Sequence, residues 1–155
     1  MFGRSSTKLY VPALGRLYEA LTPYAYPLLR FSAGAIVFPH GCQKLLGLFG
    51  GAGIAGTAAF FEKIGIVPAY PMAVLVTVVE FFGGACVAIG LLTRPWAVAL
   101  FIEMMVLVFT VHLPNGFFWN NRGIEYPLLW GIVFLVIAIR GGNGLSVDQA
   151  IGREF

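Results

Sequence analysis

The segment YPMAVLVTVVEFFGGACVAIGLLTRPWAVALFIEMMVLVFTVHL, residues 70–113, decides the fold class of this chain. It contains two apolar stretches, residues 70–92 and 95–113, with only Thr93 and Arg94 between them. Each stretch approaches the roughly 20 residues that an α-helix needs to cross about 30 Å of hydrocarbon. Because the turn is so short, we expect an antiparallel helix pair, with Pro95 at the start of the second helix.

Two further apolar stretches, residues 27–46 and 123–140, lie on either side of this pair. The whole chain is 59% hydrophobic and only 11% charged, whereas about a quarter of the residues of a soluble domain are charged. Such a composition cannot coat a water-facing surface. The sequence therefore predicts an all-α integral membrane protein in which residues 24–140 form an antiparallel bundle of four transmembrane helices.

The regions outside the bundle are short. Residues 1–23 lack a signal-peptide cleavage site, and their apolar residues recur at helical spacing, which predicts a retained amphipathic segment in the membrane interface. Residues 141–155 form a short tail. With both termini cytoplasmic, most positive charges fall on the inner side, as the positive-inside rule requires: Arg4, Lys8, Arg16, Arg94, Arg140 and Arg153. We expect a bacterial inner-membrane protein with this orientation. No basic run is interleaved with aromatic residues, so no nucleic-acid partner is predicted.

A glycine pattern in the outer loop imitates a nucleotide-binding motif. Gly51, Gly53 and Gly56 fit G-x-G-x-x-G, but a dinucleotide site needs a preceding strand and an acidic residue about 20 positions later. Here the motif follows a predicted transmembrane helix. We interpret it as a bend in the chain, followed by a short amphipathic helix within residues 57–68.

Ionisable side chains in the spans are the main functional signal, because each costs about 2.5–3.5 kcal/mol at the centre of a membrane helix. They come from all four spans and can converge only inside the bundle. Arg30 and Glu103 are predicted to form a structural ion pair that fixes helix register. The remaining five are predicted to form a polar site: His40, Lys44, Glu80, His112 and Glu125.

The charge count raises one further question. Arg30 and Lys44 face three carboxylates, Glu80, Glu103 and Glu125. We hypothesise that either Glu80 or Glu103 is protonated at neutral pH, or that a histidine is a cation paired with Glu125.

Aromatic residues of the third loop suggest a ligand for this site. A flat slot with nearby groups that exchange hydrogen bonds and protons suits a quinone head group, although aromatic residues also form membrane-interface belts. The candidate catalytic residues are His40, Glu80 and Glu125. The candidate quinone-binding residues are His40, Lys44, Glu80, His112, Trp119, Glu125 and Tyr126.

No metal site is predicted. Cys42 and Cys86 lie at different depths of opposed helices and are interpreted as apolar filler. His40 and His112 also lie at unequal depths, which argues against shared metal or haem ligation.

Several motifs together resemble the DoxX family: LRFSAGAIVFPHGCQKLLG (29–47), FFEKIGIVP (60–68), VEFFGGACVAIGLLTRPWAVAL (79–100), GFFWNNRGIEYPLL (116–129) and GGNGLSVDQAIG (141–152). The resemblance implies a four-helix inner-membrane protein associated with thiosulfate:quinone oxidoreductase or with membrane oxidoreductase complexes of the oxidative-stress response. The positions that carry the family's motifs are Arg30, His40, Gly41, Lys44, Glu80, Arg94, Glu125 and Tyr126.

Three functions remain open at this point. The first is a small membrane component of a respiratory or sulfur/oxidative-stress oxidoreductase system, with a quinone site near the outer leaflet. The second is a non-catalytic accessory subunit, for which Gly83, Gly84 and Ala88 would let a partner helix approach closely if they face lipid. The third is a proton-coupled transporter that uses Glu80 and Glu103. The expected partners are the bilayer, membrane or periplasmic oxidoreductase subunits, and a second copy of the chain.

Overall fold

The computed structural model describes residues 8–155, which form helices and connecting turns with no strand among them. The α-helices are α1 (Gly15–Leu46), α2 (Gly53–Lys63), α3 (Ala69–Val78), α4 (Gly84–Ile89), α5 (Thr93–Leu107), α6 (Glu125–Arg140) and α7 (Val147–Ile151). Two π-helical segments, η3 (Val79–Gly83) and η4 (Val108–His112), continue α3 and α5. Short 3-10 turns are η1 (Pro12–Leu14), η2 (Leu48–Gly50), η5 (Leu113–Asn115) and η6 (Trp119–Asn121). The predicted all-α class is confirmed.

Two continuous helical segments are long and apolar enough to cross a membrane. They are Ala69–Ile89 and Thr93–Asn115, with mean hydropathies of 2.2 and 2.1. A third candidate is the bent pair Pro12–Leu46 and Leu48–Lys63, whose halves meet at 97°. Helix α6 has only 16 residues. The four-span arrangement and the orientation of the termini therefore stay predictions.

Helix α1 runs without interruption through 32 residues and three internal prolines. The expected boundary between an interfacial segment (1–23) and the bundle (24–140) thus falls inside one helix, and residues 1–7 of that segment lie outside the described part of the chain. The motif at Gly51–Gly56 begins directly after η2 and continues into the start of α2. Because a helical turn, rather than a strand, precedes it, the dinucleotide interpretation is excluded as expected.

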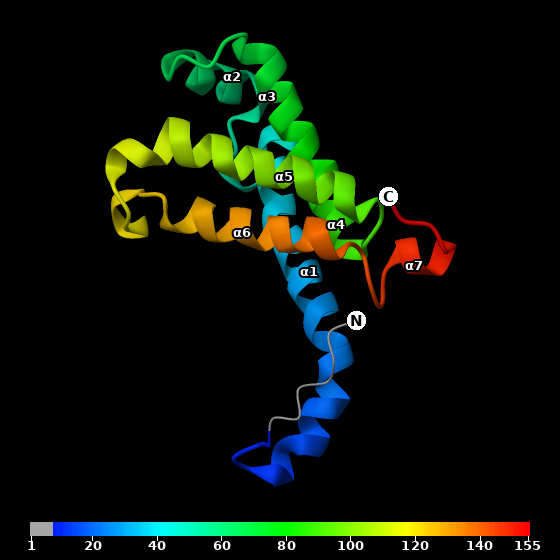
Figure 1. Ribbon diagram of the computed structural model, residues 1–155. Helices are drawn as coiled ribbons and strands as arrows, with labels where there is room; N and C mark the ends of the chain where they lie inside the picture. The colour runs from blue at the N-terminus through cyan, green and yellow to red at the C-terminus, as the bar shows by residue number, and fades with distance from the viewer. Residues whose placement is uncertain (1–7) are drawn as a thin grey trace.

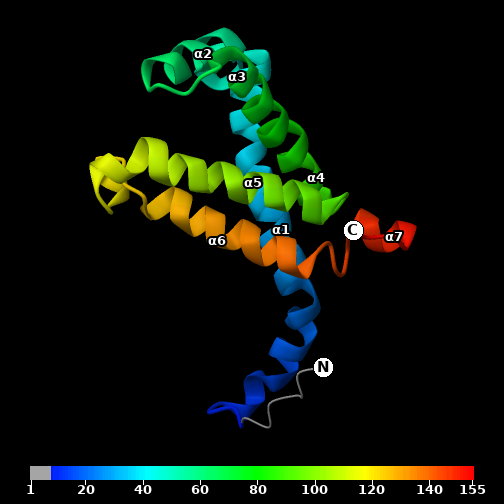
Figure 2. The same cartoon turned by 45° about the horizontal axis from the view of Figure 1, so that its top comes forward.

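The helices on either side of the 93–94 turn are neighbours only near that turn. Helix α5 then packs along α6, whereas η3 and α4 pack on α1. Figures 1 and 2 show α3 and α5 diverging on either side of the turn that joins α4 to α5, with the α5–α6 pair lying across α1. The predicted antiparallel pairing of residues 70–92 and 95–113 therefore holds where α4 and η3 meet α5, but α3 does not pack along α5.

Small residues explain why α4 and η3 pack so closely against α1. A Cβ atom on Gly34 would lie 2.4 Å from the Gly84 oxygen and the Ala88 nitrogen, and one on Gly41 would lie 2.4 Å from the Phe81 nitrogen. These backbones are in direct contact, as small residues allow between membrane helices. Gly84 and Ala88 thus face α1 rather than lipid, and their availability to a partner helix is not supported.

The C-terminal residues are docked rather than loose. Asp148 on α7 is buried and accepts hydrogen bonds from the Leu92 nitrogen (2.7 Å), the Thr93 nitrogen (3.0 Å) and the Thr93 hydroxyl (2.7 Å). Burial by itself would raise the pKa of this carboxyl, but the bonds from Thr93 and Leu92 and the charge of Arg30 hold the pKa below its usual value. Asp148 therefore caps the start of α5 and ties the tail to the turn.

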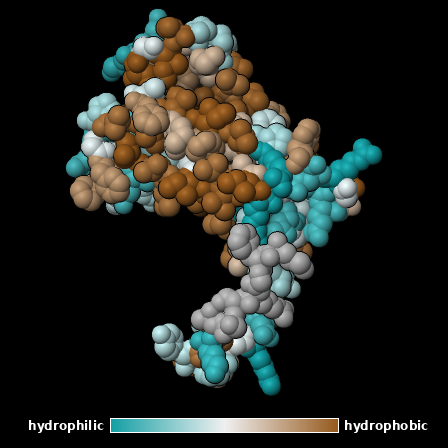
Figure 3. Space-filling view, in the orientation of Figure 1, coloured by the Kyte–Doolittle hydropathy of each residue, from teal (hydrophilic) through white to brown (hydrophobic). Residues whose placement is uncertain are grey.

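Apolar side chains are exposed over the body of the molecule. Figure 3 shows hydrophobic residues covering the region of α5 and α6, and hydrophilic residues gathered around the C-terminal end. Ile102 and Ile132 are 54% and 52% exposed. A surface of this kind is stable in lipid, which agrees with the membrane assignment.

Candidate functional site

A cavity of about 680 Å³ opens where α3 and α5 diverge. Helix α2 contributes a further wall, and α1 contributes His40 and Lys44. Most of the lining is apolar: Ala52, Gly56, Phe60, Phe61, Ile66, Met72, Leu75, Val76, Val79, Ala99, Ile102, Val106 and Leu107. The polar residues in the lining are His40, Lys44, Thr57, Glu80, Glu103 and Thr110. The cavity volume lies within the usual range for small-molecule sites.

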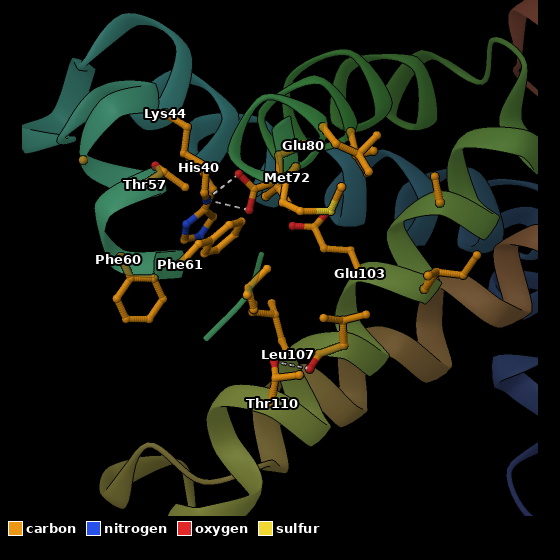
Figure 4. A pocket seen from close by; sticks show the side chains of 18 of the residues that line it. His40, Lys44, Thr57, Phe60, Phe61, Met72, Glu80, Glu103, Leu107 and Thr110 are labelled. Carbon is orange, nitrogen blue, oxygen red and sulfur yellow. Dashed lines mark hydrogen bonds and ion pairs between the residues drawn. The ribbon is translucent and has the colours of Figure 1, made fainter. Parts of the chain in front are cut away.

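Lys44 and Glu80 form an ion pair in the wall of this cavity (Figure 4). The Lys44 Nζ donates to both Glu80 oxygens, at 2.8 Å and 2.5 Å. The Glu80 side chain is 6% exposed and that of Lys44 is 22% exposed. The pair brings together two of the residues predicted for the polar site, and its combined charge is zero.

Local backbone geometry places Glu80 at the cavity. Glu80 lies in the π-helical segment η3, and the backbone at Phe81 touches Gly41 of α1. A π-helical segment changes the direction in which the side chains of a helix project and is frequent at functional sites. The close contact between α1 and η3 in turn puts Lys44 within reach of Glu80.

Glu103 lines the same cavity from α5 but has a different environment. Its side chain points toward Glu80 from the other side of the cavity (Figure 4). It is only 8% exposed, and neither of its carboxyl oxygens has a hydrogen-bond partner within residues 8–155. An isolated polar group in an apolar setting is costly, so this carboxyl is the least satisfied group of the site.

The predicted ion pair between Arg30 and Glu103 is not formed in the described chain. Arg30 is 2% exposed and donates instead to the carbonyl oxygens of Val87 (2.7 Å), Ala88 (2.8 Å) and Leu145 (2.9 Å). These carbonyls lie where α4 ends and the tail docks. The structure differs from the prediction because carbonyl groups at a helix end also attract a cation.

The five residues predicted as one polar site separate into two groups. His40, Lys44 and Glu80 line the cavity, but His112 at the end of η4 and Glu125 at the start of α6 lie at the two ends of the loop that joins α5 to α6. The His112 Nδ1 lies 2.6 Å from the Arg122 carbonyl oxygen, and the Glu125 carboxylate accepts from the Trp119 nitrogen at 3.0 Å. Both contacts hold the loop in shape.

The aromatic residues predicted to form a slot share this position. The rings of Trp119 and Tyr126 contact each other edge to face, with centroids 6.1 Å apart, and neither lines the cavity. The aromatic residues of the cavity are instead Phe60 and Phe61 of α2, and Figure 4 shows Phe61 beside His40. Because α2 precedes the second span in sequence, only its folding back over the cavity reveals this role.

Metal binding has no support from the described residues. Within residues 8–155, no three side chains of His, Cys, Asp or Glu are placed to hold a metal ion. Cys42 and Cys86 are free thiols. The chemistry that the cavity offers is hydrogen bonding and proton exchange in an apolar enclosure, carried by one ion pair and one unpartnered carboxyl.

Comparison with known proteins agrees with the architecture. The DoxX family matches residues 26–113. A putative oxidoreductase named CatD from Bacillus subtilis is 32% identical over 124 residues, which cover 80% of this chain and 84% of the relative. An uncharacterized membrane protein from Mycobacterium tuberculosis is 33% identical over 155 residues, with 92% and 91% covered. An inner membrane protein from Escherichia coli, YqjF, is 30% identical over 105 residues, with 66% and 78% covered. No solved structure matches the chain with significant similarity. The chain is a membrane protein that belongs to the DoxX family.

Proposed function

We propose that this protein is a small membrane component of a respiratory or sulfur/oxidative-stress oxidoreductase system and that its cavity binds the head group of a lipophilic quinone. The observation that carries the proposal is the cavity itself: a largely apolar space of about 680 Å³ with an ion pair and a buried carboxyl in its walls. A quinone needs both parts, because its ring and tail are apolar and its two oxygens accept hydrogen bonds. A relative named putative oxidoreductase supports the redox context.

The position of the cavity agrees with a ligand that arrives from lipid. Ile102 and Val106 line the cavity and are also 54% and 45% exposed. The same wall thus contributes to the apolar outer surface and to the interior of the site. A hydrophobic molecule dissolved in the bilayer can reach the cavity past these side chains.

The accessory-subunit alternative gains no support from Gly83, Gly84 and Ala88, because Gly83 lies against Trp96 and the backbones of Gly84 and Ala88 lie against α1. Electron transfer in this proposal involves membrane or periplasmic partner subunits that supply or remove the electrons. The protein itself would hold the quinone at a fixed position for them.

A cavity-filling substitution tests the proposal. The purified protein in lipid nanodiscs is titrated with 2,3-dimethyl-1,4-naphthoquinone, and bound quinone is measured after rapid separation. Ala99→Phe places a ring in the cavity, whereas Val98→Phe adds the same ring at the adjacent position, which is 44% exposed and outside the lining. We expect Ala99→Phe to weaken binding at least tenfold and Val98→Phe to leave it within about twofold. Equal binding by the two variants, or none by the unmodified protein, would contradict the proposal.

A further inference from the structure

Glu103 carries a second observation that the quinone cavity alone does not explain. Its carboxyl is more than nine-tenths buried, it points into the cavity, and both of its oxygens lack a partner within residues 8–155. Buried polar groups are nearly always hydrogen-bonded, and one left without a partner costs about 1–3 kcal/mol. A group kept under these conditions is expected to meet its partner in the ligand.

The cations near the cavity are already engaged. Both Glu80 oxygens take hydrogen bonds from Lys44, and Arg30 is held by backbone carbonyls at the other end of α4. The titratable groups of the lining that face Glu103 are Lys44 and Glu80, which neutralise each other, and His40, which is exposed. A negative charge on Glu103 would therefore be uncompensated in an apolar space, beside a second carboxylate.

The neutral form of the side chain has no such problem. A protonated carboxyl has one O–H donor and a carbonyl acceptor. In the cavity the donor can reach an oxygen of the ligand, and no charge has to be removed from water. A quinone ring supplies such an oxygen.

We propose that Glu103 acts as a neutral carboxylic acid that donates a hydrogen bond to a ring carbonyl oxygen of the bound molecule, and that the site thereby selects uncharged, carbonyl-bearing rings over lipophilic cations. This inference rests on the proposed function and deepens it. Glu103 is a ligand-binding residue, and the Lys44–Glu80 pair shapes the wall beside it.

A thermodynamic cycle that changes both the protein and the ligand isolates the contact between Glu103 and the ligand oxygens. The ligands are 2,3-dimethyl-1,4-naphthoquinone and 2,3-dimethylnaphthalene, which share a ring system and differ in the two oxygens. The proteins are the unmodified chain, Glu103→Leu and Glu103→Gln, all in nanodiscs. The amide of Gln retains an N–H donor but cannot become a carboxylate, whereas Leu has no donor.

We expect the preference for the quinone over the hydrocarbon to fall three- to tenfold in Glu103→Leu and to stay within about twofold in Glu103→Gln. The preference of the unmodified protein should decline at high pH, where the acid loses its proton, while that of Glu103→Gln should not change with pH. Elution profile and thermal unfolding of both variants show whether each is folded. If Glu103→Leu does not fold, the Gln comparison and the pH series decide the question alone.

Four results would overturn the inference. An unchanged preference in Glu103→Leu would mean that Glu103 does not contact the oxygens. A loss in Glu103→Gln as large as in Glu103→Leu, or tighter binding of an alkyltrimethylammonium ion than of the quinone, would mean that the side chain acts as a carboxylate. If the unmodified protein binds neither ring compound, the proposed function fails, and this inference fails with it. Binding of both compounds without any coupling to Glu103 overturns the inference alone.

Discussion

Substituting Glu80 and Glu103 separately by glutamine should affect the stability of the fold differently, although both are buried glutamates of one cavity. Glu80→Gln removes the partner of Lys44, whose Nζ lies 2.8 Å and 2.5 Å from the two Glu80 oxygens. Glu103→Gln removes no contact within the described residues, because neither Glu103 oxygen has a hydrogen-bond partner there. The first change should destabilise the fold, and the second should not.

The magnitude follows from the burial of the two partners. Removing one member of a fully buried ion pair costs about 3–5 kcal/mol, because the other charge is left unpaired. The Lys44 side chain is 22% exposed, so water can hydrate part of its charge, and we expect a loss of about 2–3 kcal/mol for Glu80→Gln. For Glu103→Gln, which replaces a neutral acid by an amide of similar size, we expect less than about 1 kcal/mol.

Unfolding in mixed micelles with increasing fractions of sodium dodecyl sulfate, followed by circular dichroism, measures these differences. The double variant Lys44→Met/Glu80→Gln removes both charges and should be more stable than the sum of the single variants by about 1–2 kcal/mol. The reasoning is refuted if Glu80→Gln is as stable as the unmodified protein, if Glu103→Gln is equally destabilised, or if the double variant shows no coupling.

Three further predictions concern the turn at residues 93–94, the contact between α1 and η3, and the loop between α5 and α6. Asp148→Ala should lower stability by about 2–3 kcal/mol, whereas the exposed Gln149→Ala should not. Because the pKa of Asp148 is lowered on folding, its contribution to stability is present above about pH 4 and is lost as the pH falls through the folded pKa. Thermal unfolding between pH 7 and pH 3 should therefore show that Asp148→Ala loses less stability on acidification than the unmodified protein. Gly41→Ala should cost about 2 kcal/mol in the micelle assay, since its Cβ would lie 2.4 Å from the Phe81 nitrogen, and Gly144→Ala, with no atom within 4 Å, should be neutral. His112→Ala should leave naphthoquinone affinity within about twofold, because His112 contacts the Arg122 carbonyl and not the cavity; a tenfold loss would place the site at the loop between α5 and α6 instead.

Part of the candidate site could be predicted from single residues. His40, Lys44 and Glu80 were identified because ionisable groups in an apolar span need a reason to be there, and all three line the cavity. The depth of a residue along its helix does not by itself show whether it lines the cavity. His112 and Glu125 lie at a suitable depth, but their partners are loop backbone atoms, which no spacing rule reveals.

The function of a buried charged side chain depends on the group that it pairs with, and the tertiary structure decides which group that is. Charge alone predicts a pair between Arg30 and Glu103. In the fold, carbonyl oxygens at the end of α4 accept the hydrogen bonds of the Arg30 guanidinium instead. Glu103 is left without a hydrogen-bond partner within residues 8–155. The sequence predicts α2 as a surface helix, and the role of Phe60 and Phe61 in the cavity lining appears only when α2 packs against α3 and α1.

The amino-acid sequence by itself determined the class of this protein: an all-α membrane protein of the DoxX family, whose buried charges mark a polar site. Hydrophobicity and charge act residue by residue, so composition and periodicity are sufficient for that conclusion. The tertiary structure decided which helices pair and where the cavity forms. Backbone contact at Gly34 and Gly41 holds α4 and η3 against α1, and the space left between α3 and α5, which diverge, becomes the site. Such contacts depend on the shapes of two surfaces meeting in space, which a linear pattern does not contain.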